Sequence, residues 1–250
     1  MKKFSIILIV LLSFTFFYDT GYAQDKPLKF GIRGKYNMAD VTENLETVVP
    51  FDYEGIEIPI QINQKMYNTF GFGGFIEYWF NPMLAVQLNA QYNMKGVKAE
   101  ADFNASFDYQ GFQINMSGNA DETIKLTYIS FPILAKIAFG NEGAVRPYLI
   151  AGPEIGILSS AKVKGEGRAT VEMPDMNYSE SVSLDEEIDI KEDVESTEFA
   201  VDFGGGVLFP LGNINLFIDA QYSLGLSKIN KEGSDDVKNK VIYLNLGLVF

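Results

Sequence analysis

A strict alternation of apolar and polar side chains, sustained over segments of ten or more residues, constrains this chain more than any other feature. The last ten residues, VIYLNLGLVF, place Ile242, Leu244, Leu246, Leu248 and Phe250 on one face. A period of two is the geometry of a β-strand, and these segments are about twice the usual strand length of five or six residues. We predict eight strands, at residues 29–37, 69–80, 83–95, 123–139, 145–161, 197–210, 214–227 and 239–250.

The connections between these segments alternate between short and long. Because the two classes alternate without exception, we expect an up-and-down meander with every short turn at one end and every long loop at the other. Asn, Pro and Gly in the short connections are typical of tight turns. The short connections are 81–82, 140–144 and 211–213, and the long ones are 38–68, 99–122, 162–196 and 228–238.

Alternation alone does not decide which row faces inward. An exported soluble ligand-binding barrel buries its apolar row, whereas a transmembrane barrel turns that row outward to lipid. The strands reach the roughly 9–11 residues that a tilted membrane strand needs, and aromatic residues gather near their ends. We therefore favour the transmembrane barrel and keep the soluble barrel as the alternative. The polar row, which the membrane reading places inside, carries Arg33, Lys35, Glu77, Lys95, Glu154, Asp202 and Asp219.

The fold class predicted from these patterns is all-β: an eight-stranded antiparallel up-and-down transmembrane β-barrel. Closure removes the strand edges, which would otherwise be unsatisfied in lipid. Eight strands enclose an interior just wide enough for side chains to fill. We expect a filled cylinder with a polar, charged interior.

The first 23 residues have the pattern of a secretory signal peptide. Lys2 and Lys3 precede an apolar run from Phe4 to Phe17, and small residues follow before Gln24. The domain organisation is therefore predicted as a signal peptide at 1–23 and one barrel domain at 24–250. The chain has no Cys and no His, which removes disulfides and the Ser-His and Cys-His dyads of nucleophilic catalysis.

Acidic charge is concentrated in the long loops. The mature chain carries a formal net charge of −14, because the first 23 residues contribute +1 to a total of −13. Such acidity argues against nucleic acid as a partner and makes the acidic loops the expected contact surface for a protein partner. Asp185, Glu187 and Asp189 alternate, but the run lacks the glycine and spacing of a calcium-binding loop. We predict no metal site and no cofactor.

The four interior carboxylates admit two readings, a catalytic cluster or an ion-pair network. Buried charges need partners, and Arg33, Lys35 and Lys95, with Lys125 or Arg146, are available to them. We favour the network and expect no catalytic residue and no enzymatic activity. The clusters Gly71/Gly73/Gly74 and 204–206 lie within strands, so we attribute them to crowding in a narrow barrel and not to phosphate binding.

Several stretches together resemble the PorT-type outer-membrane β-barrel proteins of Bacteroidetes. They cover most of the mature chain in order, although the long loops match nothing in that family. Pro132 and Pro153 sit inside strands, where prolines are expected to force bulges, and the family has prolines in similar places. The stretches are KFGIRG at 29–34, YISFPILAK at 128–136, RPYLIAGPEIG at 146–156, YSLGL at 222–226 and LGLVF at 246–250.

The resemblance implies an integral protein of the cell outer membrane with both termini in the periplasm, short periplasmic turns and long extracellular loops. It also implies a link to protein export, without any catalytic residue. Tyr243 and Phe250, on the last strand, resemble the C-terminal signal read by the outer-membrane assembly machinery. Two functions stay open: a structural or accessory barrel, and a small-molecule or ion binder or channel that uses the polar lumen.

Overall fold

The computed structural model describes residues 27–44, 47–53, 56–109, 111–232 and 236–250. The predicted signal peptide therefore lies outside the described residues. Within them, one antiparallel sheet of 11 strands accounts for most of the described residues. The strands are β1 (Leu28–Val41), β2 (Thr47–Tyr53), β3 (Ile56–Lys65), β4 (Tyr67–Trp79), β5 (Leu84–Tyr109), β6 (Phe112–Ala138), β7 (Arg146–Met173), β8 (Tyr178–Asp189), β9 (Thr197–Leu211), β10 (Ile214–Gly225) and β11 (Asn239–Val249), with a short 3-10 turn, η2 (Pro174–Met176), before β8.

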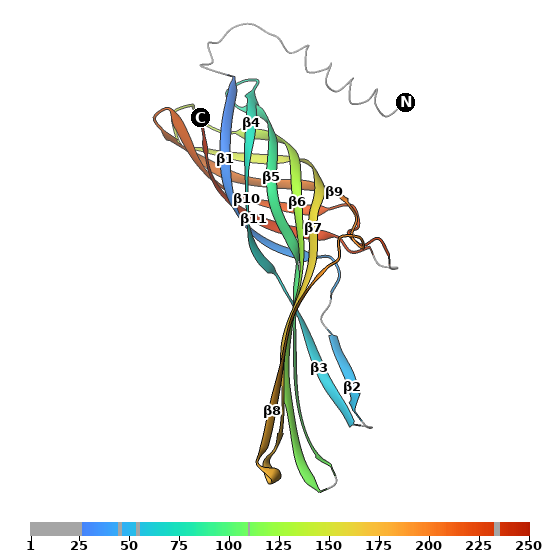
Figure 1. Cartoon of the computed structure of the whole chain (residues 1–250). Coiled ribbons are helices and arrows are strands. Elements are labelled where there is room, and N and C mark those ends of the chain that lie inside the picture. The colour runs from blue at the N-terminus through green and yellow to red at the C-terminus, as the bar shows by residue number, and fades with distance from the viewer. Residues whose placement is uncertain (1–26, 45–46, 54–55, 110, 233–235) are drawn as a thin grey trace.

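Eight of these strands close into a ring. The order around it is β1-β4-β5-β6-β7-β9-β10-β11, and β11 pairs with β1 to complete the circle. The seam runs from Gly31 opposite Val249 to Val41 opposite Asn239. All eight predicted segments correspond to the strands of this ring. Figure 1 shows the C-terminus at one end of the ring, with long strands projecting from the other end.

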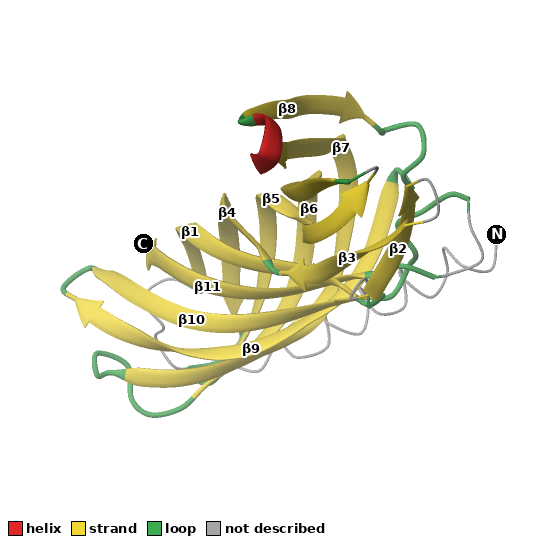
Figure 2. Ribbon diagram, turned by 90° about the horizontal axis from the view of Figure 1, so that it is seen from below, coloured by secondary structure: helices red, strands yellow, loops and turns green. Residues whose placement is uncertain are grey.

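The predicted long loops are not loops throughout. β5, β6 and β7 continue well beyond the ring, and β2, β3 and β8 pair alongside them in the order β2-β3-β5-β6-β7-β8. We call this six-stranded continuation, residues 47–65, 98–122 and 163–189, the extension (Figure 2). The reading of 38–68, 99–122 and 162–196 as loops is therefore wrong for most of their length. β3 pairs with β5 there, β5 with β6, and β7 with β8.

Burial along each ring strand follows the alternation read from the sequence. On β1, Ile32 is 56 % exposed and its neighbour Arg33 only 4 %. The same holds at the end of the chain, where Leu246 is exposed and Asn245 buried. The ring therefore turns its apolar row outward and its polar row inward, as the transmembrane prediction requires. The soluble alternative, which buries the apolar row, is wrong.

In the extension this polarity is inverted. The strand positions that continue the inner row of the ring become apolar, as at Phe103 and Met116, which meet Ile58 and Ile60 around a small hollow. The positions that continue the outer row become polar, as at Asp102 opposite Asn119. A single sheet thus changes from polar-inside to apolar-inside along its length.

The two strand prolines do not produce the bulges expected of them. The β6–β7 register is the same on both sides of Pro132, and Pro153 pairs in register with Val201. The missing proline N–H groups are accommodated by local gaps in pairing, and Asn89 Nδ2 donates to the Pro132 carbonyl at 3.1 Å. The register shift between β6 and β7 instead lies at Thr127/Tyr128.

The glycine cluster at 204–206 is explained by close approach of neighbouring strands. A Cβ on Gly204 would lie 2.2 Å from the Ala220 carbonyl oxygen, and one on Gly206 would lie 2.4 Å from the Asp219 side chain. Gly205, which points outward, is less crowded, with the Tyr148 oxygen at 2.9 Å. Crowding therefore acts on the inward-facing glycines most strongly.

Two apolar clusters occupy the ends of the ring interior. The first lies towards the short turns and includes Phe75, Trp79 and Phe217. The second lies towards the extension and includes Val97, Leu126 and Val194. Polar side chains fill the space between the two clusters.

Candidate functional site

The ring interior is the first candidate site, and it is densely charged. The structure places all seven interior residues named from the sequence in the buried row. Ten buried charged side chains are described, five basic and five acidic, so the interior is formally balanced. They are Arg33, Lys35, Lys95, Lys136, Arg146, Glu77, Glu154, Glu198, Asp202 and Asp219.

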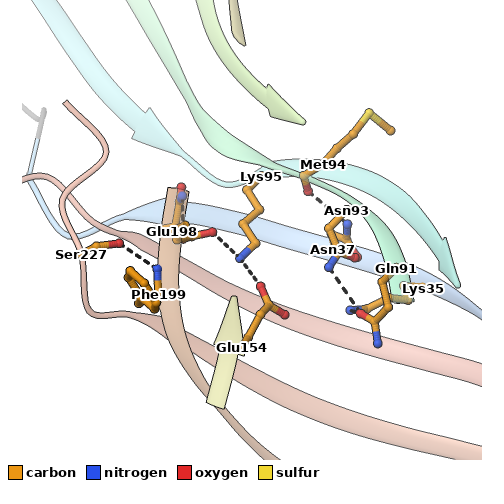
Figure 3. Close-up of polar contacts among 11 residues, drawn as sticks. Lys35, Asn37, Gln91, Asn93, Met94, Lys95, Glu154, Glu198, Phe199 and Ser227 are labelled. Carbon is orange, nitrogen blue, oxygen red and sulfur yellow. Dashed lines mark hydrogen bonds and ion pairs between the residues drawn. The ribbon is translucent and has the colours of Figure 1, made fainter. Parts of the chain in front are cut away.

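Lys95 on β5 is the centre of the network nearest the extension. Its Nζ donates to Glu154 Oε1 on β7 and to Glu198 Oε2 on β9, both at 2.8 Å (Figure 3). Asn239 Nδ2 donates to the other oxygen of Glu198 at 2.9 Å. One ammonium thus pairs with two buried carboxylates and joins three strands across the ring.

Lys35 on β1 lies deeper in the lumen and has no carboxylate as its hydrogen-bond acceptor among the described residues. Its Nζ donates to Gln91 Oε1 at 2.6 Å and lies 3.5 Å from the centre of the Tyr243 ring. Asn93 Nδ2 donates to the same Gln91 oxygen at 3.3 Å. Figure 3 shows Gln91 and Asn93 projecting from one strand towards Lys35. The cation is held by an amide oxygen and an aromatic face.

A second ion pair lies towards the short turns. Lys136 Nζ donates to Glu77 Oε1 at 2.6 Å, and Trp79 Nε1 donates to Glu77 Oε2 at 3.0 Å. Lys136 also lies 4.3 Å from the centre of the Tyr148 ring. Arg146 packs over Trp79 at 5.3 Å and donates to the Pro82 carbonyl, so it caps this end of the interior.

Asp219 on β10 accepts three hydrogen bonds. The donors are Tyr148 Oη at 2.6 Å, Gln221 Nε2 at 2.9 Å and Asn245 Nδ2 at 2.5 Å. Arg33 stacks between two aromatic rings, 4.6 Å from the centre of Phe75 and 5.4 Å from that of Phe217. The carboxylate is thus satisfied by neutral donors, and the guanidinium lies against aromatic faces.

Asp202 is the exception in the network. Neither of its carboxylate oxygens has a hydrogen-bond partner among the described residues, and the same is true of Nε and Nη1 of Arg33. Both residues are buried in the ring. The interior therefore holds charged atoms whose direct pairing is incomplete.

Sequence reasoning missed two members of the network, Glu198 and Lys136. Both lie on the inward row of predicted strands. Glu198 is an even number of residues from Asp202 on β9, and Lys136 is an even number from Tyr128 on β6, so the alternation could have identified both. Of the two cations offered as alternatives, Arg146 is inside, whereas Lys125 lies on the outer row and is 3.7 Å from Glu187 of the extension. Lys125 therefore takes no part in the interior network.

The extension is the second candidate site, and its charge is mostly acidic. Its three segments contain 16 Asp and Glu against four Lys and Arg. At its base, Lys162 donates a hydrogen bond to Glu187, which lowers the pKa of that carboxyl and raises the pKa of the lysine. Among the described residues, no group of three or more acidic side chains is arranged to hold a metal ion.

The chain matches the model of the family described as the outer membrane protein beta-barrel domain, over residues 22–231. The match covers well over half of the sequence. The chain belongs to this family. No curated protein sequence matches the chain.

Solved structures of outer-membrane barrels resemble this outer-membrane β-barrel in fold only. Neisserial surface protein A is 12 % identical, with a TM-score of 0.41, and the match covers 90 % of this chain and 96 % of that one. Ail of Yersinia pestis is 18 % identical, with a TM-score of 0.31 and coverage of 90 % and 100 %. OprG of Pseudomonas aeruginosa is 14 % identical, with a TM-score of 0.35 and coverage of 90 % and 97 %.

In an outer-membrane barrel the exposed apolar row is the lipid-facing surface. No helix within the described part of the chain is both long and apolar enough to cross a membrane. The lipid-facing row ends towards the extension at a set of lysines, one on each of four strands. They are Lys98, Lys125, Lys162 and Lys240, and each lies within 4 Å of an acidic side chain.

The two residues assigned to a C-terminal assembly signal face opposite ways. Phe250 is exposed on the lipid-facing row, whereas Tyr243 is fully buried in the lumen beneath Lys35. The assignment of both residues to assembly stays a prediction. Of the two side chains, the exposed Phe250 ring is the one that an assembly factor can contact.

Proposed function

We propose that this protein is a non-enzymatic, accessory barrel of the outer membrane whose acidic extension contacts a protein partner outside the cell. The observation that carries the proposal is the extension itself. Three ring strands continue past the lipid-facing belt, three more strands pair alongside them, and the six bear a large excess of acidic side chains.

In this proposal both termini and the short turns lie in the periplasm and the extension lies outside. The support is the usual plan of such barrels, with short periplasmic turns and longer external loops. The assembly machinery of the outer membrane recognises β11 with its terminal Phe250. The resemblance to PorT-type proteins implies an origin in Bacteroidetes and adds a link to protein export. Measuring protein export in a deletion strain tests this link.

The absence of an enzymatic role is supported by the chemistry of the interior. The chain has no His to act as a general base near neutral pH. Glu77 and Glu154 are each hydrogen-bonded to a lysine, and Asp219 accepts three donors. Carboxylates committed in this way stabilise the barrel and are poor proton donors or acceptors for a substrate.

A second candidate function is the binding of a small molecule at the outer mouth of the ring. A pocket of about 250 Å³ lies there between the β8–β9 and β10–β11 connections. Its walls are mainly aliphatic and include Val97, Ile124 and Val194. A site in the polar lumen, which the charged network lines, stays the alternative. Openings in single-channel recordings would instead favour a conducting lumen.

The test is complementation of a deletion strain. One plasmid carries the full chain, and a second carries a shortened chain in which residues 47–64, 100–121 and 164–187 are replaced by short Gly-Ser turns. We expect both proteins to reach the outer membrane and to show heat-modifiable migration. Only the full chain should restore the parental phenotype and the parental set of secreted proteins. Full complementation by the shortened chain would show that the extension is not the functional surface.

A further inference from the structure

The outer edge of β8 is an unoccupied strand edge at the side of the extension. All 12 residues of β8 are exposed, and within the described chain β8 pairs with β7 alone. The β7–β8 register is continuous from Met173 opposite Tyr178 to Lys162 opposite Asp189. A strand of this length with a continuous register offers about six backbone positions to an incoming strand.

The direction of the free backbone groups follows from one hydrogen bond. Ile190 N donates to the Ala161 carbonyl at 3.0 Å, one pair beyond the end of β8. Since N–H groups alternate between the two sides of an antiparallel strand, even-numbered residues of β8 bond to β7 and odd-numbered residues point their N–H groups outward. Ser179, Ser181 and Ser183 are three of the outward donors.

This edge lacks the backbone features, proline and bulges, that usually protect an exposed strand, and its protection is the charge of its acidic side chains. β8 contains no Pro, no Gly and no Lys, and its register with β7 shows no bulge. The opposite edge of the extension, β2, carries Pro50, which removes a backbone donor. Exposed edges without such features are templates for pairing with another strand.

The side chains of β8 define what an added strand must carry. Val182, Leu184 and Ile188 are exposed on the face that continues the apolar inner side, next to a hollow of about 580 Å³ that Leu184 helps to line. Glu180 and Glu186 interrupt that face, and the alternate face carries three serines followed by Asp185, Glu187 and Asp189. β8 has five carboxylates and no basic residue, and among the described residues only Asp185 and Glu187 lie within 4 Å of a lysine.

We propose that the β8 edge binds an extended segment of a partner protein by strand addition, and that this segment alternates apolar and basic residues. Backbone hydrogen bonds to the outward N–H and C=O groups supply affinity, and the alternating side chains supply selectivity. Apolar residues of the segment extend the row of Val182 and Leu184. Basic residues lie on the other face and meet Asp185, Glu187 and Asp189. The inference rests on the proposed contact role of the extension and names its mode and partner chemistry.

A second copy of this chain is a poor occupant of the same edge. Pairing of β8 with β8 would bring two strands with five carboxylates each side by side, and like charges on neighbouring strands destabilise the pair. The charge therefore acts against self-association while attracting a basic segment. Charge complementarity is the reason that the partner is heterologous.

The test uses the full chain in phosphatidylcholine nanodiscs and a fluorescent ten-residue peptide of alternating Lys and Val. An otherwise identical Glu-Val peptide is the charge control. The chain variants are Ser183→Pro, which removes an outward N–H while leaving the β7 ladder, and Ser183→Ala, which keeps that N–H. We expect the Lys-Val peptide to bind the parent and Ser183→Ala alike, and Ser183→Pro about tenfold more weakly.

Hydrogen exchange supplies the second readout. Peptide binding should slow exchange of about half the amides in residues 178–189 and leave the ring unchanged. Equal binding to Ser183→Pro and Ser183→Ala would overturn strand addition, as would equal binding of the two peptides or dimerisation of the chain through β8. None of these results bears on complementation by the shortened chain, so this inference can fail while the proposed function stands.

Discussion

At the residue scale, the interior of the ring depends on a few side chains that each satisfy several partners. Lys95 is the clearest case, because it is fully buried and bonds two carboxylates from different strands. A buried charge that loses its partner costs far more than an exposed ion pair contributes. The effect of each substitution therefore depends on which charges it leaves unpaired. Combined substitutions separate the cost of an unpaired buried charge from the contribution of the ion pair itself.

Lys95→Met should destabilise the barrel by about 3–5 kcal/mol, since it leaves Glu154 and Glu198 buried without their cation. The triple variant Lys95→Met, Glu154→Gln, Glu198→Gln should recover much of that loss, because no uncompensated charge remains. The measurement is urea unfolding in lipid bilayers, followed by the fluorescence of Trp79, the single Trp of the chain. Equal stability of parent and Lys95→Met would contradict the assigned role.

Gly204→Ala should cost about 1–3 kcal/mol in the same assay, because its Cβ would press on the backbone of β10. The matched control is Gly34→Ala on β1, where an added Cβ meets nothing within 4 Å. We expect that control to lie within about 0.5 kcal/mol of the parent. Similar losses for both substitutions would point to strand propensity and not crowding as the cause.

At the scale of strands, the seam between β1 and β11 joins the two ends of the described chain. Phe250 N donates to the Phe30 carbonyl at 2.7 Å, and Phe30 N donates back at 3.3 Å. The last residue thus contributes both a backbone pair to closure and an exposed ring to the lipid-facing row. These two contributions can be separated by substitution.

Deleting Phe250 should reduce the amount of barrel assembled in the outer membrane, because it removes both the closing hydrogen bonds and the exposed aromatic ring. Phe250→Ala keeps the backbone pair and tests the ring alone, and Phe250→Tyr restores an aromatic. We expect assembly to follow the order parent, Tyr, Ala, deletion, as measured by heat-modifiable migration in membrane fractions. Wild-type levels for the deletion would remove any role for this residue.

The strands of the ring were predictable because each has one row that meets lipid and one that meets the interior. In the β7–β8 hairpin the difference in polarity between the two rows is weaker. The apolar row is interrupted by Gly165 and Gly167 and the strand that follows is acidic, so the segment resembled a solvated loop. Glu198 and Lys136 face inward, as the alternation along their strands predicts. Their partners could not be inferred, because pairing across the lumen depends on strand order and tilt.

At the scale of the whole molecule, the reversal of polarity along one sheet marks where lipid ends. On β6 the outer row runs from Ile133 and Ile129 to Lys125 and then Asp121, while the strand itself continues without a break. The same change occurs on β7 between Ile157 and Lys162. We expect these lysines to lie at the level of the lipid headgroups, because the acidic extension begins directly beyond them.

This boundary can be located because the chain contains no Cys, so single spin-labelled cysteines can be placed at will. Labels at Ile133, Ile129, Lys125 and Asp121 sample the outer row of β6. We expect high oxygen accessibility at the first two and high accessibility to a water-soluble nickel reagent at Asp121, with the crossover between Ile129 and Lys125. A label at Leu134, which is buried, should be shielded from both reagents. High oxygen accessibility at Asp121 would extend the membrane into the extension and contradict its role as an external contact surface.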